Sequence, residues 1–250
     1  MSIQLLDVRK SFGSRIILDG VSLEVGDGET VAVIGQSGAG KSVLLKTIVG
    51  LLEPDAGSVT VDGQEVAALE REELYALRRK VGYVFQFAAL FDSMSVFDNV
   101  AMGLRRIVTM TDEEIAERVT DSLHRVDMDG FADRMPGQLS GGQRKRVGFA
   151  RAIATRPKYL LYDEPTTGLD PVTTAVIDEL VLRMARDLGV AGIVITHDMK
   201  SAFRVANRIA MLYQGRIRFI GTPQEVETAE DPIVRAFVDG RPDLMNEVAA

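Results

Sequence analysis

Apolar positions alternate with polar ones, and then run together, in the first part of the chain. Every second position of residues 21–25 is apolar, which predicts a half-exposed strand. Residues 30–34 form a continuous apolar run, typical of a strand buried in a parallel sheet. Asp62 and Gly63 separate two short β-prone runs, which indicates a hairpin. This region is therefore predicted to combine an antiparallel ribbon with a buried central strand.

Residues from about 95 to 155 follow helical spacing instead. Thr111 and Glu114 have the spacing of a capping box, in which two side chains satisfy the first free amides of a helix. After them, one helical face is apolar and comprises Ile115, Val119, Leu123 and Val126. This region is predicted to form a helical subdomain at about residues 90–155.

Buried strands return at residues 159–162, 192–196 and 208–213. The helix expected between the first two has Asp170 as its N-cap, Pro171 in its first turn and Gly189 at its end. Strands that alternate with helices predict the α/β class with a mostly parallel sheet. We expect one domain over residues 1–241, and a C-terminal extension at residues 222–250 that forms a short helix and a tail.

Composition and charge exclude several classes of function. The formal net charge is −7, which argues against nucleic acid as a partner. Cysteine is absent, so disulfides and thiolate metal sites are excluded. The first ten residues have no long apolar core, and no apolar run approaches the ~20 residues of a membrane-spanning helix. Neither a signal peptide nor a membrane anchor is expected.

Residues 35–42 match the pattern G-x-x-x-x-G-K-[ST], with an apolar strand before it and a helix-forming run after it. Glycines let backbone amides converge on phosphate oxygens, and the helix adds its positive end. Lys41 is predicted to reach the outer phosphates, and the Ser42 hydroxyl to bind Mg²⁺. A glycine-rich turn without a ligand is the alternative, and the Lys-Ser pair disfavours it.

Two further segments carry candidate chemistry. A buried strand ends at Asp163 and Glu164, where one carboxylate suits Mg²⁺ and the next suits activation of a water molecule. A surface acidic pair is the alternative. Residues 139–147, LSGGQRKRV, have the composition of a second anion-binding helix start. Its basic run, residues 144–146, is interpreted either as a source of local positive potential or as a solvated helix face.

These segments occur in an order and at a spacing that resemble the nucleotide-binding subunits of ABC transporters, over roughly residues 3–221. The resemblance implies a P-loop ATPase core with a mostly parallel sheet, an N-terminal antiparallel β subdomain and an inserted helical subdomain. It also implies ATP and Mg²⁺ as ligands. The implied ATP contacts are Phe12, Gly35, Gln36, Ser37, Gly38, Ala39, Gly40, Lys41, Ser42 and Val43.

The same resemblance assigns the remaining roles. Glu164, His197 and Gln86 are implied as catalytic, and Ser42, Gln86 and Asp163 as metal contacts, the last through water. Two copies would dimerise head to tail, with Asp170 in the interface loop. The segment that meets the partner's ATP would be Ser140, Gly141, Gly142 and Gln143. Each chain would then need two anion sites because each ATP needs two chains.

Residues 87–105 lie where a membrane permease docks in this family. Their apolar side chains, at least half of which are expected in the core, are Phe87, Leu90, Phe91, Met94 and Phe97. This segment and residues 222–241 are similar to the ATPases of Mla-type phospholipid transport systems, which work with MCE proteins.

That narrower resemblance implies a permease dimer, an MCE-domain protein, a STAS-domain subunit in some systems, phospholipid as cargo, and a place at the cytoplasmic face of the bacterial inner membrane. The alternatives are an amino-acid or other small-solute importer, and an ATP-switched protein acting on DNA or ribosomes. The absence of long coiled-coil arms disfavours the last.

Overall fold

The computed structural model describes residues 2–107 and 110–241. The chain folds into two compact units. The first unit comprises Met1–Leu74 and Gly192–Ala250, and the second comprises Tyr75–Ala191. The boundary between Leu74 and Tyr75 falls within helix α2 (Arg71–Arg79). Within the described residues, no helix has the length and apolar character needed to cross a bilayer.

An antiparallel sheet forms one part of the first unit. Its strands lie in the order β2-β1-β4-β5. Their bounds are β1 (Ile3–Phe12), β2 (Arg15–Val25), β4 (Ala56–Val61) and β5 (Gln64–Glu65). Val21, Leu23 and Val25 are buried while their neighbours Ser22 and Glu24 are exposed, so the alternation in sequence is confirmed. Asp62 and Gly63 form the predicted hairpin turn between β4 and β5.

A second set of strands in the first unit surrounds β3 (Thr30–Ile34), whose five residues are all buried. Strand β3 pairs in parallel with β8 (Ala191–Ile195) on one side and β9 (Arg208–Tyr213) on the other. Strand β10 (Arg216–Gly221) pairs antiparallel with β9. The helical elements of this unit that lie between strands are α1 (Lys41–Ile48), η1 (Val66–Ala68) and α7 (Met199–Val205).

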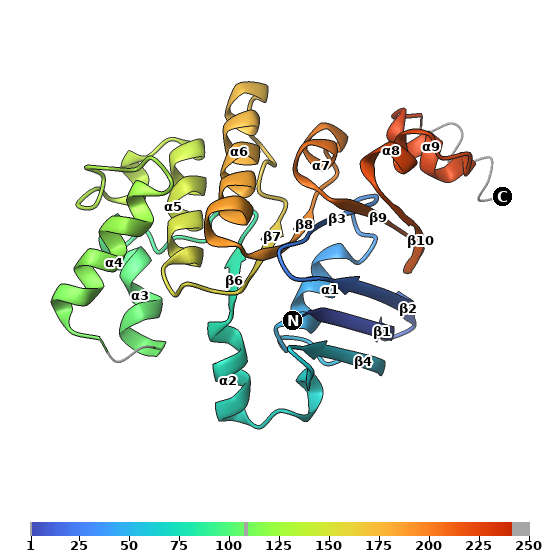
Figure 1. Cartoon of the computed structure of the whole chain (residues 1–250), viewed down its shortest axis with the longest axis horizontal. Helices are drawn as coiled ribbons and strands as arrows, with labels where there is room; N and C mark the ends of the chain where they lie inside the picture. Colours follow the sequence, from blue (N-terminus) through green and yellow to red (C-terminus); the bar gives the residue numbers. More distant parts are fainter. Residues whose placement is uncertain (1, 108–109, 242–250) are drawn as a thin grey trace. The chain divides into compact units, whose positions relative to one another are not determined.

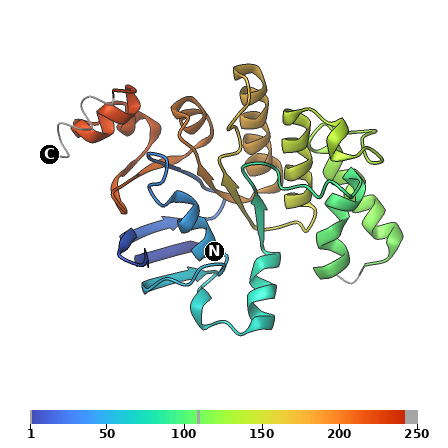
Figure 2. The same cartoon turned by 180° about the vertical axis from the view of Figure 1, so that it is seen from behind.

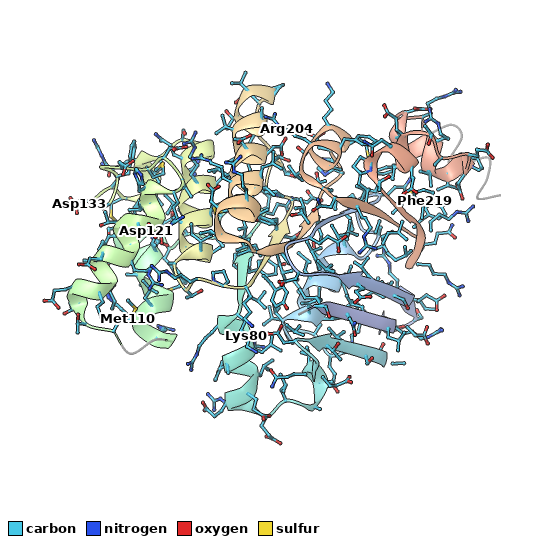
Figure 3. The ribbon with its side chains drawn as sticks, viewed as in Figure 1. Lys80, Met110, Asp121, Asp133, Arg204 and Phe219 are labelled. Atoms are coloured by element: carbon cyan, nitrogen blue, oxygen red, sulfur yellow. The ribbon has the colours of Figure 1, made fainter. Side chains whose placement is uncertain are left out.

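The C-terminal extension contains two short helices, α8 (Pro223–Glu227) and α9 (Pro232–Val238), where one was predicted. The reason is a repeated start signal, because Thr222 and Asp231 each cap a helix whose first residue is proline. Val226, Ile233 and Val234 pack on the buried residues of β3 and β9, and Phe219, labelled in Figure 3, packs against the same cluster. Figure 2 shows both helices beside the end of the sheet, and residues 242–250 of the predicted tail lie outside the described residues.

The second unit contains a parallel strand pair and a group of helices. Strand β6 (Val81–Val84) pairs with β7 (Tyr159–Asp163). Helices α3, α4 and α5 lie side by side (Figure 1). The helical bounds are α3 (Val96–Ile107), α4 (Asp112–His124), η2 (Pro136–Gln138), α5 (Gly141–Ile153) and α6 (Pro171–Leu188).

The predicted start and stop signals of helices α4 and α6 are confirmed. Thr111 and Glu114 form a complete capping box at the start of α4, and Ile115, Val119 and Leu123 are buried. Asp170 caps α6 and Gly189 ends it in a left-handed conformation. Local signals therefore set the bounds of α4 and α6, and their apolar faces set the packing.

Candidate functional site

The phosphate loop, residues 35–42, joins buried strand β3 to helix α1 in the first unit. Gly35, Gly38 and Gly40 have φ values of 153°, 78° and 104°, which residues with a Cβ rarely adopt. A Cβ at Gly35 would lie 2.3 Å from the carbonyl oxygen of Leu212. Only glycine fits this position, so the backbone can turn tightly here, and the amides of such a loop suit a bound anion.

Lys41 is the first residue of α1 and is only 4% exposed. Its ammonium donates hydrogen bonds to the carbonyl oxygens of Gly35 at 2.8 Å and Gln36 at 2.9 Å. The positive charge is thereby held within the curve of its own loop. An ammonium placed there beside converging amides suits a polyphosphate.

Phe12 and His197 also belong to the first unit. Phe12 ends β1, is 49% exposed, and has the ammonium of Lys10 5.8 Å from its ring centroid. His197 follows β8 and is exposed. Its neighbour Asp198 caps α7, accepting a hydrogen bond from the Lys200 amide at 2.9 Å, so the backbone beside His197 is fixed.

In the second unit, Gln86 and Glu164 lie together, although they are far apart in sequence. The Gln86 amide donates to the Glu164 carboxylate at 3.2 Å, and the Thr167 hydroxyl donates to the same oxygen at 2.7 Å. Glu164 has φ 47°, a left-handed conformation that turns the chain at the end of β7. Two predicted site residues are thus brought into contact, with the carboxylate oriented by two donors.

Asp163 precedes Glu164 and ends strand β7. The Tyr83 hydroxyl donates to its carboxylate at 3.1 Å. Burial, followed by the charge of Asp163, raises the pKa of Tyr83 well above its usual value, so the phenol stays protonated as a donor. The Tyr83 hydroxyl therefore fixes one side of the Asp163 carboxylate.

The second anion-binding helix start is the N-terminus of α5. Ser140 caps it, its hydroxyl accepting from the Gln143 amide at 3.3 Å while the Gln143 side chain accepts from the Ser140 amide at 2.8 Å. Gly141 and Gly142 form the first turn of the helix, whose amides lack partners within the helix. The Ser140 hydroxyl accepts in this cap, which leaves its proton to donate to an anion.

Asp170 accepts hydrogen bonds from the amides of Val172 and Thr173, both at 3.0 Å, as the cap of α6. The Thr173 side-chain and backbone bonds lower the pKa of Asp170, so this carboxylate is charged at neutral pH. The methyl of Thr173 lies 2.7 Å from the place that a Cβ on Gly142 would take. The starts of α5 and α6 therefore touch, and only glycine at position 142 leaves room.

The exposed aromatic segment differs from its prediction. Phe87 is 79% exposed and Phe91 is 48% exposed. The other three apolar residues of the segment, Leu90, Met94 and Phe97, are half-buried. The prediction that at least half of the five lie in the core is wrong, because Asn99 and Val96 of the same stretch take the buried positions.

The sequence did not point to Tyr83 or Lys145. Tyr83 is a half-buried residue of strand β6, and no local sequence pattern distinguishes it from an ordinary strand residue. Lys145 belongs to the basic run 144–146, for which a solvated helix face was one interpretation, yet it is 5% exposed and donates to the Gln86 carbonyl oxygen. That interpretation is wrong for Lys145, because successive helix residues point about 100° apart and only one of three faces inward.

ATP fits the phosphate loop, because its glycines permit a tight turn that a Cβ at Gly35 or Gly40 would prevent, and the Lys41 ammonium lies within it. Among the described residues, no three His, Cys, Asp or Glu side chains gather as a metal site. Of the residues predicted to contact Mg²⁺, Ser42 belongs to the first unit, and Gln86 and Asp163 belong to the second.

Comparison with known proteins agrees with this geometry. Residues 18–167 match the family described as ABC transporter. The probable ribonucleotide transport ATP-binding protein mkl of Mycobacterium leprae (strain TN) is 37% identical over 241 residues, which are 96% of this chain and 70% of that protein. The sulfate/thiosulfate import ATP-binding protein CysA of Bradyrhizobium diazoefficiens is 43% identical over 243 residues, 96% and 68% of the two chains.

Solved structures show the same fold. The dimeric structure of the ATP-binding cassette MJ0796, in a post-hydrolysis state bound to ADP and phosphate, has a TM-score of 0.81 and 34% identity, and the match covers 88% of this chain and 98% of that one. CbiO1 from Clostridium perfringens, part of the transporter complex CbiONQ, has a TM-score of 0.84 and 29% identity, with 99% and 98% coverage.

The fold and the phosphate loop define an α/β P-loop ATPase. Since the family match covers more than half of the chain, the chain belongs to the ABC transporter family. It is an ATP-binding, ATP-hydrolysing subunit of such a transporter.

Proposed function

We propose that this chain is the ATP-driven motor of a bacterial transporter that moves phospholipid, and that it works as a head-to-tail dimer around two ATP molecules. The observation that carries the motor function is the Glu164 carboxylate, which two donors orient at the end of β7. A carboxylate held in this way suits the task of orienting and deprotonating an attacking water.

Each residue of the site has a role in this proposal. The phosphate loop and Lys41 bind the phosphates of ATP, Phe12 stacks on the base, and His197 contacts the terminal phosphate. Mg²⁺, when bound, neutralises charge on the phosphates. Gln86 and Thr167 orient Glu164, and Tyr83 donates to Asp163, so both carboxylates are held by neighbouring donors.

The dimer follows from the two anion-binding helix starts. Ser140 and the amides of Gly141 and Gly142 would contact the terminal phosphate of the ATP held by the partner. ADP lacks that phosphate, so hydrolysis removes the ligand of the second helix start and loosens the dimer. The dimeric assembly of the cassette MJ0796 supports this arrangement.

The motor proposal predicts the behaviour of Glu164→Gln, which keeps the shape and loses the carboxylate. Steady-state hydrolysis should fall by about 100-fold or more, because general-base catalysis contributes factors of that size. With ATP and Mg²⁺, the variant should elute as a dimer in size-exclusion chromatography, because the ligand that holds the two chains together persists.

Ser140→Arg is the matched control, because it blocks the second helix start and leaves the phosphate loop intact. It should bind ATP as a monomer and hydrolyse it slowly. Wild-type turnover by Glu164→Gln would remove Glu164 from the catalytic role, and full-rate hydrolysis by a strictly monomeric protein would refute the dimer.

The membrane partner would dock on the exposed aromatic side chains of this segment, Phe87 and Phe91. Exposed aromatic residues in one patch are typical of interaction surfaces. The resemblance of residues 87–105 and 222–241 to Mla-type ATPases supports phospholipid as cargo. In that arrangement the partners are a permease, an MCE-domain protein and, in some systems, a STAS-domain subunit, and the chain lies peripherally at the cytoplasmic face of the inner membrane.

A second candidate is the import of a small solute, because two relatives carry such names. Mkl is named for ribonucleotide transport and CysA for sulfate and thiosulfate import. The motor chemistry is the same in both cases. The two candidates differ in the partner and in the molecule carried.

A further inference from the structure

Helix α5 presents a row of three residues to residues 86–89 of the same unit. Lys145, Gly148 and Arg151 are spaced three apart, so they lie along one helical face. A Cβ on Gly148 would lie 3.3 Å from the Cβ of Ala88, so the helix and the 86–89 segment are in close contact there. The helix that begins with the predicted ATP-sensing segment therefore also packs on Gln86.

Lys145 lies at one end of this row and is 5% exposed. Its ammonium donates to the carbonyl oxygen of Gln86 and, at 3.4 Å, to the carbonyl oxygen of Glu164. Burial lowers the pKa of Lys145, and the charge of Glu164 opposes that shift. A buried cation persists only where acceptors compensate for lost water, and here the acceptors are the backbones of two site residues.

Arg151 lies at the other end of the row. Its guanidinium donates to the carbonyl oxygens of Ala88 at 2.5 Å and Ala89 at 2.6 Å, and it lies 5.7 Å from the ring centroid of Phe85. Ala88 and Ala89 have φ values of 59° and 48°. Left-handed alanines are unfavourable by themselves, so these contacts hold the segment in an unusual backbone conformation.

Glu164 also has a left-handed backbone conformation that its contacts hold in place. Its side chain is oriented by Gln86 and Thr167, and its carbonyl oxygen by Lys145. Gln86 is held twice as well, through its own amide and through its carbonyl oxygen. One ammonium thus joins the backbones of two residues whose side chains already touch.

We propose that Lys145 is a positioning residue for ATP hydrolysis, which ties Gln86 and Glu164 to helix α5 so that the carboxylate and the glutamine amide keep their mutual placement. The proposal rests on the catalytic role given to Glu164 above. It makes α5 a direct link between the helix start that senses the partner's ATP and the carboxylate that activates water.

The test is Lys145→Met in the full chain, which keeps an unbranched side chain, one heavy atom shorter, and removes the three donors of the ammonium. A misplacement of catalytic groups by about 1 Å can cost 100-fold in rate. We expect kcat to fall by about 10- to 100-fold while KM for ATP changes by less than about two-fold, because the phosphate loop is untouched. Lys158→Met, the same substitution at an exposed lysine of this unit, should keep the wild-type kcat.

A double-mutant cycle separates positioning from general damage to the fold. If Lys145 acts through Glu164, adding Lys145→Met to Glu164→Gln should change the residual single-turnover rate by less than about two-fold. A further loss as large as that in the wild-type background would overturn the proposal, and so would a wild-type kcat in Lys145→Met. If Lys145→Met melts below the assay temperature, Lys145→Gln takes its place under the same criteria.

The catalytic role of Glu164 and the positioning role of Lys145 are tested separately. Wild-type turnover in Glu164→Gln refutes the role of Glu164 itself, whatever Lys145 does. An inactive Glu164→Gln beside a fully active Lys145→Met refutes only the positioning role.

Discussion

At the scale of single residues, charge pairs link strands that are distant in sequence. The Glu29 carboxylate accepts from the Arg208 guanidinium at 3.0 Å and from the Gly26 amide at 2.9 Å. Glu29 precedes β3 and Arg208 begins β9, so this pair ties the ends of two neighbouring parallel strands. The Arg208 hydrogen bond, as the largest cause, lowers the pKa of Glu29 below its usual 4.5.

This shift predicts a pH dependence of stability. Since the folded-state pKa of Glu29 is depressed, the pair stabilises the fold above the unfolded value of 4.5, and the contribution is lost as pH falls through the folded-state pKa. The melting temperature of Glu29→Gln should therefore be lower than that of the wild type at pH 7. The difference in melting temperature should shrink below pH 4.5. Thermal melts by circular dichroism across this range measure it.

Glu230→Gln is the control for the change of charge alone, because Glu230 is exposed. Its melting temperature should equal that of the wild type at every pH. A Glu29→Gln difference that stays constant from neutral to acidic pH would contradict the ionic origin of the effect.

Residue roles could be predicted where a local pattern carries them. The phosphate loop was predicted because its glycines and Lys41 are adjacent in sequence. Lys145 was not, because its partners, the carbonyl oxygens of Gln86 and Glu164, come from distant segments and no side-chain pattern marks a backbone acceptor. In sequence it is one of three basic residues, and only the packing of α5 distinguishes it.

At the scale of elements, the caps were more predictable than the packing. The start of α4 follows from Thr111 and Glu114, and that of α6 from Asp170 and Pro171. The division of the C-terminal extension into α8 and α9 followed from the same kind of signal at Asp231, which the prediction of one helix overlooked. Burial of the aromatic segment could not be predicted, because apolar side chains serve both a core and an interface.

The capping box of α4 gives a prediction for the element as a whole. Thr111→Ala removes the hydroxyl that accepts from the Glu114 amide at 3.3 Å. The free energy of unfolding should fall by about 1 kcal/mol, the usual contribution of an N-cap. Denaturant titration followed by circular dichroism measures the change.

Thr120→Ala, within the same helix, is the comparison. Thr120 donates to the Ala116 carbonyl oxygen inside α4, and alanine has the higher helix propensity, so this variant should lose no stability. Equal losses in the two variants would show that the cap contributes nothing specific.

At the scale of the whole molecule, the candidate residues belong to both units. Phe12, the phosphate loop and His197 lie in the first, and Gln86, the carboxylates and the start of α5 lie in the second. The family could be predicted from the order of these motifs, and the match to residues 18–167 confirms it. The cargo could not be settled in the same way, because ATP-binding subunits with different cargoes share the residues that bind and hydrolyse ATP.

Purification of the full chain from membranes tests the cargo. If phospholipid is moved, the chain should co-purify with a permease and bound phospholipid, identified by mass spectrometry. Phe87→Ser should weaken this association because Phe87 is 79% exposed, whereas Leu51→Ser, at a site 57% exposed in the other unit, should not. Co-purification with a soluble binding protein and no lipid would favour small-solute import, and capture of ribosomes or DNA would refute transport.

The bonds of Lys41 to Gly35 and Gln36 bear on how quickly the subunit exchanges its nucleotide. A free lysine side chain has about 2 kcal/mol of rotamer entropy to lose when it is fixed. Here the side chain is already ordered when the protein folds. When a phosphate binds, the Lys41 ammonium therefore only exchanges a carbonyl oxygen for a phosphate oxygen as its acceptor. When ADP dissociates, the ammonium returns to a carbonyl oxygen of its own loop. Lys41 therefore adds little ordering cost to either step, which suits a motor that must empty and refill its loop in every cycle.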